Sequence, residues 1–210
     1  MYRKFAAGVL AAITLSTTAF AQERNELGLL LGGTVTPDQV TTGASGENIE
    51  FGVGHTFQAT YARHLLEGGG LRLSLEVPFL AAPSIKVSSI NQAVPQEYAS
   101  LFLTPGLRVS FVPDGVLSPW LSVGGGYALF EHANELLSGD PNDPANRHRH
   151  SGAAQVGGGV DIHTPLRLLF PVTLRLEVRD LYSGSPNYNV DTNKGNQHNV
   201  VFSGGFAIHF

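Results

Sequence analysis

Eight segments of this chain alternate apolar residues with small or polar ones at a period of two. They are Glu26 to Val35, Ile49 to Ala62, Leu71 to Leu80, Leu101 to Phe111, Pro119 to Phe130, Ala154 to His163, Val172 to Leu181 and Gln197 to Phe210. Successive side chains of a β-strand point to opposite faces, so the pattern predicts strands whose two faces meet different surroundings. Twenty-five glycines, twelve prolines and only 14% charged residues also favour strands and turns over a helical bundle.

The connections between these segments alternate in length. Short turns follow the second and fourth segments, whereas long polar loops occupy residues 36–48, 81–97, 131–150 and 182–196. Transmembrane β-barrels show this alternation, with short periplasmic turns and longer extracellular loops. We therefore predict an all-β fold: an eight-stranded antiparallel up-and-down transmembrane β-barrel that forms one domain over residues 22–210.

The composition of the two strand faces favours a membrane barrel over a soluble β-sandwich or a lipocalin-like barrel. Large apolar residues share one face, and glycine, serine and threonine share the other with charged residues. We predict that these charges form a network in a sealed polar interior, because a buried unpaired charge is costly. Its predicted members, four acids and four arginines, are Glu50, Arg72, Glu76, Arg108, Asp161, Arg175, Glu177 and Arg179.

Three residues do not fit this alternation. His55 falls on the lipid-facing phase of its segment, Pro105 interrupts the fourth segment, and Pro78 lies within the third. Proline withholds a donor from the strand ladder. We therefore expect either β-bulges near these positions or a register shifted by one residue.

The first residues of the chain have the pattern of a secretory signal peptide. Arg3 and Lys4 precede the apolar run Phe5 to Leu15, and Ala19-Phe20-Ala21 offers small residues for cleavage. Residues 1–21 are therefore predicted to be a signal peptide, because the apolar run is short for the alternative, a membrane-anchoring helix. The sequence has no cysteine, which excludes disulfides and thiolate metal sites. Its net charge of -4 gives no reason to expect a nucleic-acid partner.

The stretch LRLEVRDLYSG and the ending GGFAIHF resemble the last two strands of small outer-membrane barrels of the porin-like superfamily. In strand count and loop alternation the chain is similar to the OmpA-type transmembrane domain and to OmpX-like and OmpW-like proteins. The resemblance implies location in the cell outer membrane, a monomer in contact with lipid and lipopolysaccharide, and no peptidoglycan-binding domain after Phe210. It also implies that the assembly machinery reads the terminal strand through Phe206, Ile208 and Phe210.

Three functional hypotheses follow. The leading one is a non-enzymatic barrel with a side-chain-filled interior, which has a structural or surface-interaction role through four extracellular loops. The alternative is a narrow ion or small-solute channel in which the interior ion pairs rearrange. A less favoured alternative is an outer-leaflet lipid-modifying enzyme, but adjacent His150 and Ser151 would point to opposite faces of a strand and could not pair. No catalytic residue and no cofactor is therefore predicted.

One histidine-rich loop is a candidate metal site. Arg147-His148-Arg149-His150 lies at one end of this loop and His132 at the other. The arginines oppose a cation, and no carboxylate stands at a fixed spacing. We interpret the run as a basic patch near lipopolysaccharide phosphates, and predict no metal site.

Overall fold

The computed structural model describes residues 24–42, 46–167 and 171–210. The predicted signal peptide, residues 1–21, lies outside them and stays a prediction. Within these ranges no helix has the length and apolar character needed to cross a bilayer. The elements are β1 (Asn25–Val35), β2 (Gln39–Val40), β3 (Asn48–Phe51), β4 (Gly54–Gly68), β5 (Leu71–Ser89), β6 (Glu97–Leu103), β7 (Gly106–Phe111), β8 (Leu117–His132), a short 3-10 helix η2 (Pro144–Asn146), β9 (His148–Arg167), β10 (Pro171–Gly184) and β11 (Asn196–His209).

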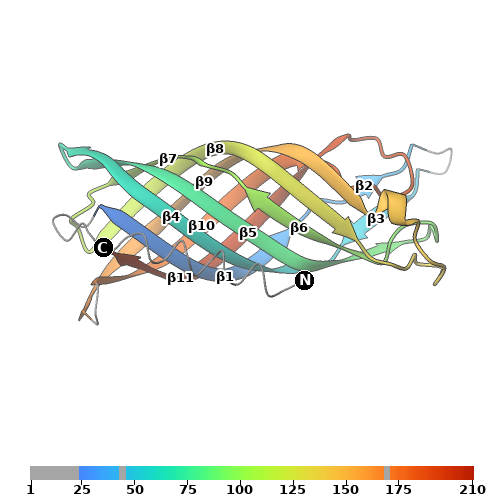
Figure 1. Cartoon of the computed structure of the whole chain (residues 1–210), viewed down its shortest axis with the longest axis horizontal. Helices are drawn as coiled ribbons and strands as arrows, with labels where there is room; N and C mark the ends of the chain where they lie inside the picture. The colour runs from blue at the N-terminus through green and yellow to red at the C-terminus, as the bar shows by residue number, and fades with distance from the viewer. Residues whose placement is uncertain (1–23, 43–45, 168–170) are drawn as a thin grey trace.

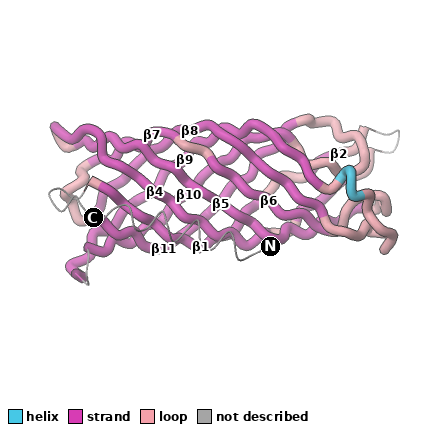
Figure 2. Tube along the Cα trace, in the orientation of Figure 1, coloured by secondary structure: helices cyan, strands magenta, loops and turns pink. Residues whose placement is uncertain are grey.

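The strands close into a ring, and Figures 1 and 2 show them tilted relative to the long axis of the barrel. β1 pairs with β11 on one side and with β4 on the other, and the ring continues through β5, β8, β9 and β10. β3 and β4 both pair with β5 and together make up one strand of the ring. In the same way β6 and β7 together make up the strand between β5 and β8. The described residues thus form eight positions with antiparallel neighbours, which confirms the predicted eight-stranded barrel.

The two ends of the barrel differ in their connections. At one end, which we call the turn end, Gly69 and Gly70 join β4 to β5 with φ of 62° and 77°, and residues 112–116 join β7 to β8. The last residue, Phe210, lies at this end too and exchanges two backbone hydrogen bonds with Asn25. The opposite end, the loop end, carries the connections 36–53, 90–96, 133–147 and 185–195. Pink loops gather there in Figure 2.

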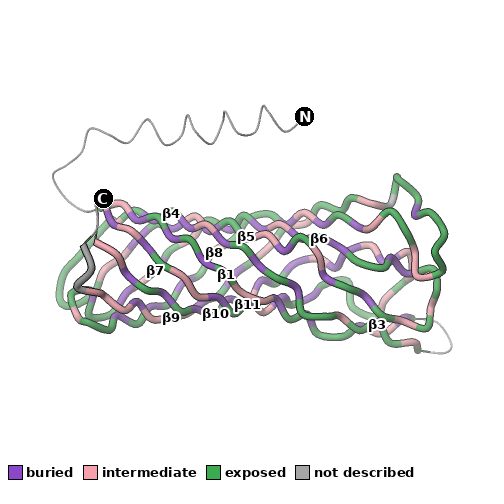
Figure 3. The backbone as a smooth tube through the Cα atoms, turned by 90° about the horizontal axis from the view of Figure 1, so that it is seen from below, coloured by how far each residue is buried: buried purple, intermediate pink, exposed green. Residues whose placement is uncertain are grey.

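The strand faces separate apolar from polar residues as the alternation predicts. Exposed and buried positions alternate along the strands, as the green and purple segments of Figure 3 show. The outward side chains include large apolar ones that stay exposed: Leu31, Phe57, Leu121, Val123, Leu176 and Phe202. Because water would not stabilise so continuous an apolar surface, the outer face suits contact with lipid.

The alternation changes phase twice near the loop end. At Gly52 and Val53, between β3 and β4, the chain slips by one residue, so Ile49 is buried whereas Glu50 is exposed. β5 has its own irregularity between Ala82 and Ile85 and then continues to Ser89, through residues predicted to be loop. A β-bulge moves every later side chain to the other face. The predicted interior position of Glu50 is therefore wrong.

The structure shows where the three residues that do not fit the alternation lie. His55 is exposed on the outer face of β4, just after the slip. Pro105 is also exposed and separates β6 from β7, yet Phe102 and Arg108 on either side both remain buried. Pro78 is buried, and its carbonyl oxygen accepts a hydrogen bond from Thr104 N at 3.3 Å. Neither proline shifts the phase.

The close contact between β1 and β11 predicts that a larger residue at Gly205 destabilises the folded barrel. A Cβ atom added at Gly205 would lie 2.1 Å from the backbone oxygen of Leu29 and 2.7 Å from Leu30 Cα. Gly205→Ala should therefore lower the free energy of unfolding by about 1–3 kcal/mol through overpacking. Gly152→Ala is the control, since nothing lies within 4 Å of its added Cβ. Urea unfolding in lipid vesicles, followed by fluorescence of the single tryptophan, measures both; equal stability of the two variants would contradict the prediction.

Candidate functional site: the barrel interior

The turn-end half of the interior holds a network of buried ion pairs, which we call the ionic layer. Its members are Glu26, Glu76, Arg108, Asp161, Arg175, Glu177 and Arg179, each at most 5% exposed. They come from β1, β5, β7, β9 and β10, so the layer crosses the barrel rather than following one wall.

Two arginines of this layer share Glu26. Arg108 donates from Nη1 and Nη2 to the two carboxylate oxygens of Glu26 at 2.9 and 2.6 Å. Arg175 donates from Nη1 to Glu26 Oε1 at 2.7 Å, and its Nε and Nη2 bind the two oxygens of Asp161, each at 2.7 Å. Bidentate pairs of this kind are among the strongest charge-assisted hydrogen bonds.

Arg179 forms the second half of the ionic layer. Its Nε donates to Glu177 Oε1 at 2.6 Å, and its Nη1 donates to Glu76 Oε1 at 2.7 Å. Gln58 adds a 2.6 Å bond to Glu177, and Gln155 a 3.3 Å bond to Glu76. A longer contact of 3.8 Å between Arg108 and Glu76 joins the two halves.

Trp120 stands at the centre of the ionic layer. The guanidinium carbons of Arg108, Arg175 and Arg179 lie 5.7, 5.5 and 5.2 Å from its ring centroid. The indole Nε1 donates to Asp161 Oδ1 at 3.2 Å. The ring therefore fills the space between the ion pairs and adds cation–π attraction to each of these arginines.

The structure changes the predicted membership of the network. Six of the eight predicted residues lie in the ionic layer, but Glu50 is exposed and Arg72 binds Glu67 at 2.8 Å beside the turn between β4 and β5. Glu26 was missed, although the alternation places it on the same face as Gly28 and Leu30. The described layer thus has four carboxylates and three guanidinium groups, a formal charge of -1 rather than the expected balance.

The loop-end half of the interior holds an apolar cluster, which the predicted polar interior did not include, beside buried polar residues such as Gln39, Gln197 and Asn199. We call this cluster the aromatic layer; its members are Ile49, Leu80, Ala82, Ile85, Val87, Val94, Tyr98, Phe102, Ala128, Phe130, Leu181, Tyr188 and Val201. Ring centroids of Phe102 and Phe130 lie 5.8 Å apart, and those of Tyr98 and Phe130 lie 6.1 Å apart. The phase slips turn Ile49, Ile85 and Val87 inward. Other members, such as Leu80, Phe102 and Leu181, lie on the same inward phase of their strands as the ionic layer.

The loops themselves close this end. Tyr188, from the connection between β10 and β11, is 1% exposed and donates to Gln197 Oε1 at 2.8 Å, and its burial raises the pKa of its phenol well above the usual value. The connections also bind one another: Thr42 N to Asp191 O at 2.9 Å and Leu137 N to Val94 O at 2.8 Å. The loop end is therefore one connected cap over the aromatic layer.

His150 and Ser151 do not form a catalytic pair. His150 contacts the Tyr127 hydroxyl through Nδ1, while the hydroxyl of Ser151 donates to Gly152 O and accepts from Gly184 N. These partners keep His150 and Ser151 from forming a nucleophile–base pair. His198 Nδ1 does lie 2.7 Å from Asp180 Oδ2. The His198 ring packs beside the Tyr182 ring, with centroids 4.9 Å apart, and among the described residues no serine hydroxyl bonds to His198.

The histidine-rich loop does not gather its imidazoles. His132 is buried and contacts the backbone oxygen of Arg147 at 3.2 Å, His148 contacts Glu131 at 3.6 Å, and His150 lies against Tyr127 on the outer face. Each ring has a separate partner. The predicted assembly residues lie near the turn end, with Phe206 exposed and Ile208 and Phe210 half-buried; their role stays a prediction.

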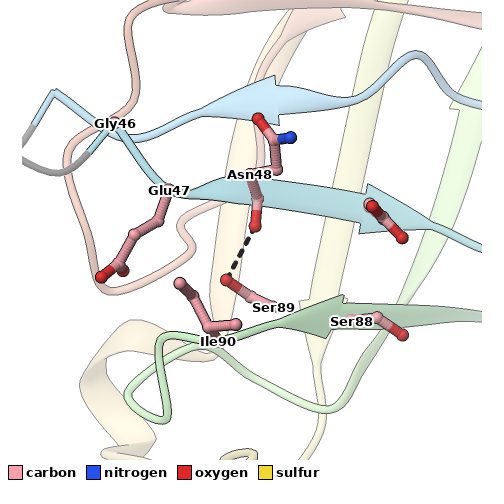
Figure 4. Close-up of a pocket in the computed structure, with 7 residues that line it drawn as sticks. Gly46, Glu47, Asn48, Ser88, Ser89 and Ile90 are labelled. Carbon is pink, nitrogen blue, oxygen red and sulfur yellow. Dashed lines mark hydrogen bonds between the residues drawn. The ribbon is translucent and has the colours of Figure 1, made fainter.

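A shallow hollow of about 530 Å³ lies at the loop end between β3 and β5 (Figure 4). Ser89 Oγ donates to Asn48 O at 2.9 Å across it, and Glu47 and Glu50 belong to its lining. Glu50 and Ser88 are exposed residues of the outward phase. The hollow is therefore a feature of the outer rim and does not lead through the barrel.

No protein-family description and no curated protein matches this sequence. The fold, however, is similar to that of solved structures. Neisserial surface protein A has a TM-score of 0.53 and 14% identity over 90% of this chain and 98% of that chain. The outer membrane protein OprG from Pseudomonas aeruginosa has a TM-score of 0.51 and 12% identity over 89% and 96%. At these identities the likeness shows the fold alone, that of small outer-membrane β-barrels.

The ionic layer predicts a large difference between two arginine substitutions. Arg179→Met keeps most of the side-chain volume but leaves Glu76 and Glu177 without their nearest cation, so it should lower the free energy of unfolding by about 3–5 kcal/mol. Arg72→Met removes the partly exposed pair with Glu67 and should cost about 0–1 kcal/mol. Urea unfolding in vesicles, read through Trp120 fluorescence, compares them. Equal losses would show that the layer does not depend on its charges.

Proposed function

Because the chain has the fold of a small outer-membrane β-barrel, we propose that it is a closed, non-enzymatic barrel of the cell outer membrane. In this proposal its four loops form an interaction surface outside the cell, and the predicted signal peptide, residues 1–21, directs its export. The observation that carries the proposal is an interior occupied by two successive layers, one ionic and one aromatic.

The ionic layer supports a barrier to ions. An eight-stranded barrel is only wide enough for its own side chains to fill. A permeating ion would have to displace Trp120 and separate pairs such as Arg175–Asp161 and Arg179–Glu76, which are held at 2.7 Å. Breaking a buried pair costs about 3–5 kcal/mol, so opening several at once is strongly unfavourable.

The aromatic layer and the cap support a second barrier in series with the first. Tyr98 and Tyr188 are each 1% exposed, and their rings lie 6.3 Å apart near the loop end. Asn189 Nδ2 also donates a hydrogen bond to Asn142 Oδ1 at 3.0 Å, which connects the loop 185–195 to the loop 133–147. A connected cap presents a defined surface, which suits recognition of a partner better than separate mobile loops would.

The surroundings of the barrel follow from the same proposal. The apolar outer face would contact outer-membrane lipid, and Arg147 and Arg149 near the loop end would lie close to lipopolysaccharide phosphates. We also propose that the barrel is a monomer and that the assembly machinery recognises Phe206, Ile208 and Phe210. The separate partners of His150 and Ser151 support the view that it is not an enzyme.

Single-channel recording in a planar bilayer tests the closed barrel. The refolded protein, with a heat-dependent gel shift as the control for closure, should give no discrete conductance steps. Steps from folded protein would contradict the proposal and favour the narrow channel. If Arg108→Ala rescales those steps, the ionic layer is the gate; if it leaves them unchanged, the ions follow another path.

A further inference from the structure

Two histidines lie close to Glu26 at the turn end of the interior, and a third lies near one of them. His209, near the end of β11, faces Glu26 of β1 directly in the strand register, and His64 lies two residues beyond Ala62, the β4 partner of Glu26. One ligand atom from each of Glu26, His64 and His209 lies within 4.8 Å of the other two. The His163 ring, from β9, lies 6.3 Å from the His209 ring.

The donor atoms at this point have unused bonding capacity. His64 Nε2 is buried and has no hydrogen-bond partner among the described residues. Glu26 accepts three hydrogen bonds from Arg108 and Arg175, whereas a carboxylate offers about four acceptor positions. A buried imidazole nitrogen without a partner is unfavourable, so a partner for His64 Nε2 would stabilise the site.

Two of the rings are already oriented by a second partner. The Thr173 hydroxyl lies 3.1 Å from His209 Nε2, which leaves Nδ1 of that ring for another ligand. His163 Nδ1 lies 2.8 Å from the backbone oxygen of Gly115. Because a carbonyl oxygen can only accept a hydrogen bond, Nδ1 carries the proton and Nε2 keeps its lone pair. Histidines that bind metals are usually held in this way by their other nitrogen.

The charge of the surroundings permits a cation despite the arginines nearby. The half of the ionic layer around Glu26 is balanced, with Glu26 and Asp161 paired to Arg108 and Arg175, so no net positive charge there opposes a cation. Arg108 and Arg175 would remain as hydrogen-bond donors that orient the ligating carboxylate, the usual outer partners of such a ligand.

From these observations we propose that Glu26, His64 and His209 form a binding site for a divalent transition-metal ion such as Zn²⁺, with His163 available as a fourth ligand. Imidazole and carboxylate ligands suit this class of ion. Bonds of about 2.1 Å place tetrahedral ligands about 3.4 Å apart, so the side chains must close inward from their present separation.

The position of the site gives the metal a structural role. Its ligands come from β4, β1 and β11, and the pairing of β1 with β11 joins the first strand of the ring to the last. A metal bound there would connect the two strands whose separation opens the barrel. Since an ion that binds only the folded state stabilises it by mass action, Zn²⁺ should slow or oppose opening at this seam.

Titration of tag-free refolded protein in detergent micelles with Zn²⁺ tests the proposal, with Co²⁺ absorption as a second readout of coordination. We expect one ion per chain, at least tenfold weaker binding by His64→Gln and by His209→Gln, and no change in His55→Ala, whose ring lies on the outer face of the same strand as His64. Zn²⁺ should also raise the urea concentration needed to unfold the wild type but not His64→Gln. A heat-dependent gel shift confirms that each variant is folded.

Two results would overturn the site. One is the absence of stoichiometric Zn²⁺ binding to folded wild-type protein. The other is binding that His64→Gln and His209→Gln leave unchanged but that His148→Ala or His150→Ala removes, since that would place the ion at the loop end. If a histidine variant fails to fold, the effect of Zn²⁺ on the unfolding of wild type, His148→Ala and His150→Ala still decides: an effect that is absent from wild type or lost in either loop-end variant overturns the site, and an effect that persists in both supports it.

Discussion

The pairing of β1 with β11 is the contact on which the rest of this structure depends. Ten residue pairs, from Glu26–His209 to Val35–Val200, join the first strand to the last. Without them two strand edges would face the hydrocarbon, where an unsatisfied backbone group costs several kcal/mol. The close approach at Gly205 belongs to this seam, and so do the histidines and the carboxylate that we assign to a metal.

Closure at eight strands also decides what the interior can hold. A ring of this size is just wide enough for side chains to fill or for one small ligand, so inward side chains meet across the axis. Charged groups are tolerated there only when they are paired, and Arg108, Arg175 and Arg179 each bind at least one carboxylate at 2.9 Å or less. Trp120 fills the space between these arginines, so the ionic layer is packed across the interior and does not only coat its wall.

Two local irregularities contribute to the contrast between the two halves of the interior. Where the phase of the strands is continuous, from Thr56 to Ala62 and from Phe102 to Arg108, even-numbered residues face inward. After the irregularities at Gly52–Val53 and Pro83–Ser84, odd-numbered residues such as Ile49 and Ile85 face inward instead. The two single-residue slips thereby add Ile49, Ile85 and Val87 to an apolar cluster whose other strand residues need no slip, and Tyr188 from the last loop packs with them.

The sequence by itself determined the strands, their order and the outward apolar face, because a period of two is a local property that each segment carries alone. It also placed six members of the ionic layer, from Glu76 to Arg179, on one face. Only the tertiary structure decided the remainder: that Glu50 points outward, that Glu26 binds two arginines, and that His64 meets His209. These depend on bulges and on the closure of the ring, which bring together residues separated by up to 183 positions, and no local pattern encodes contacts across a barrel.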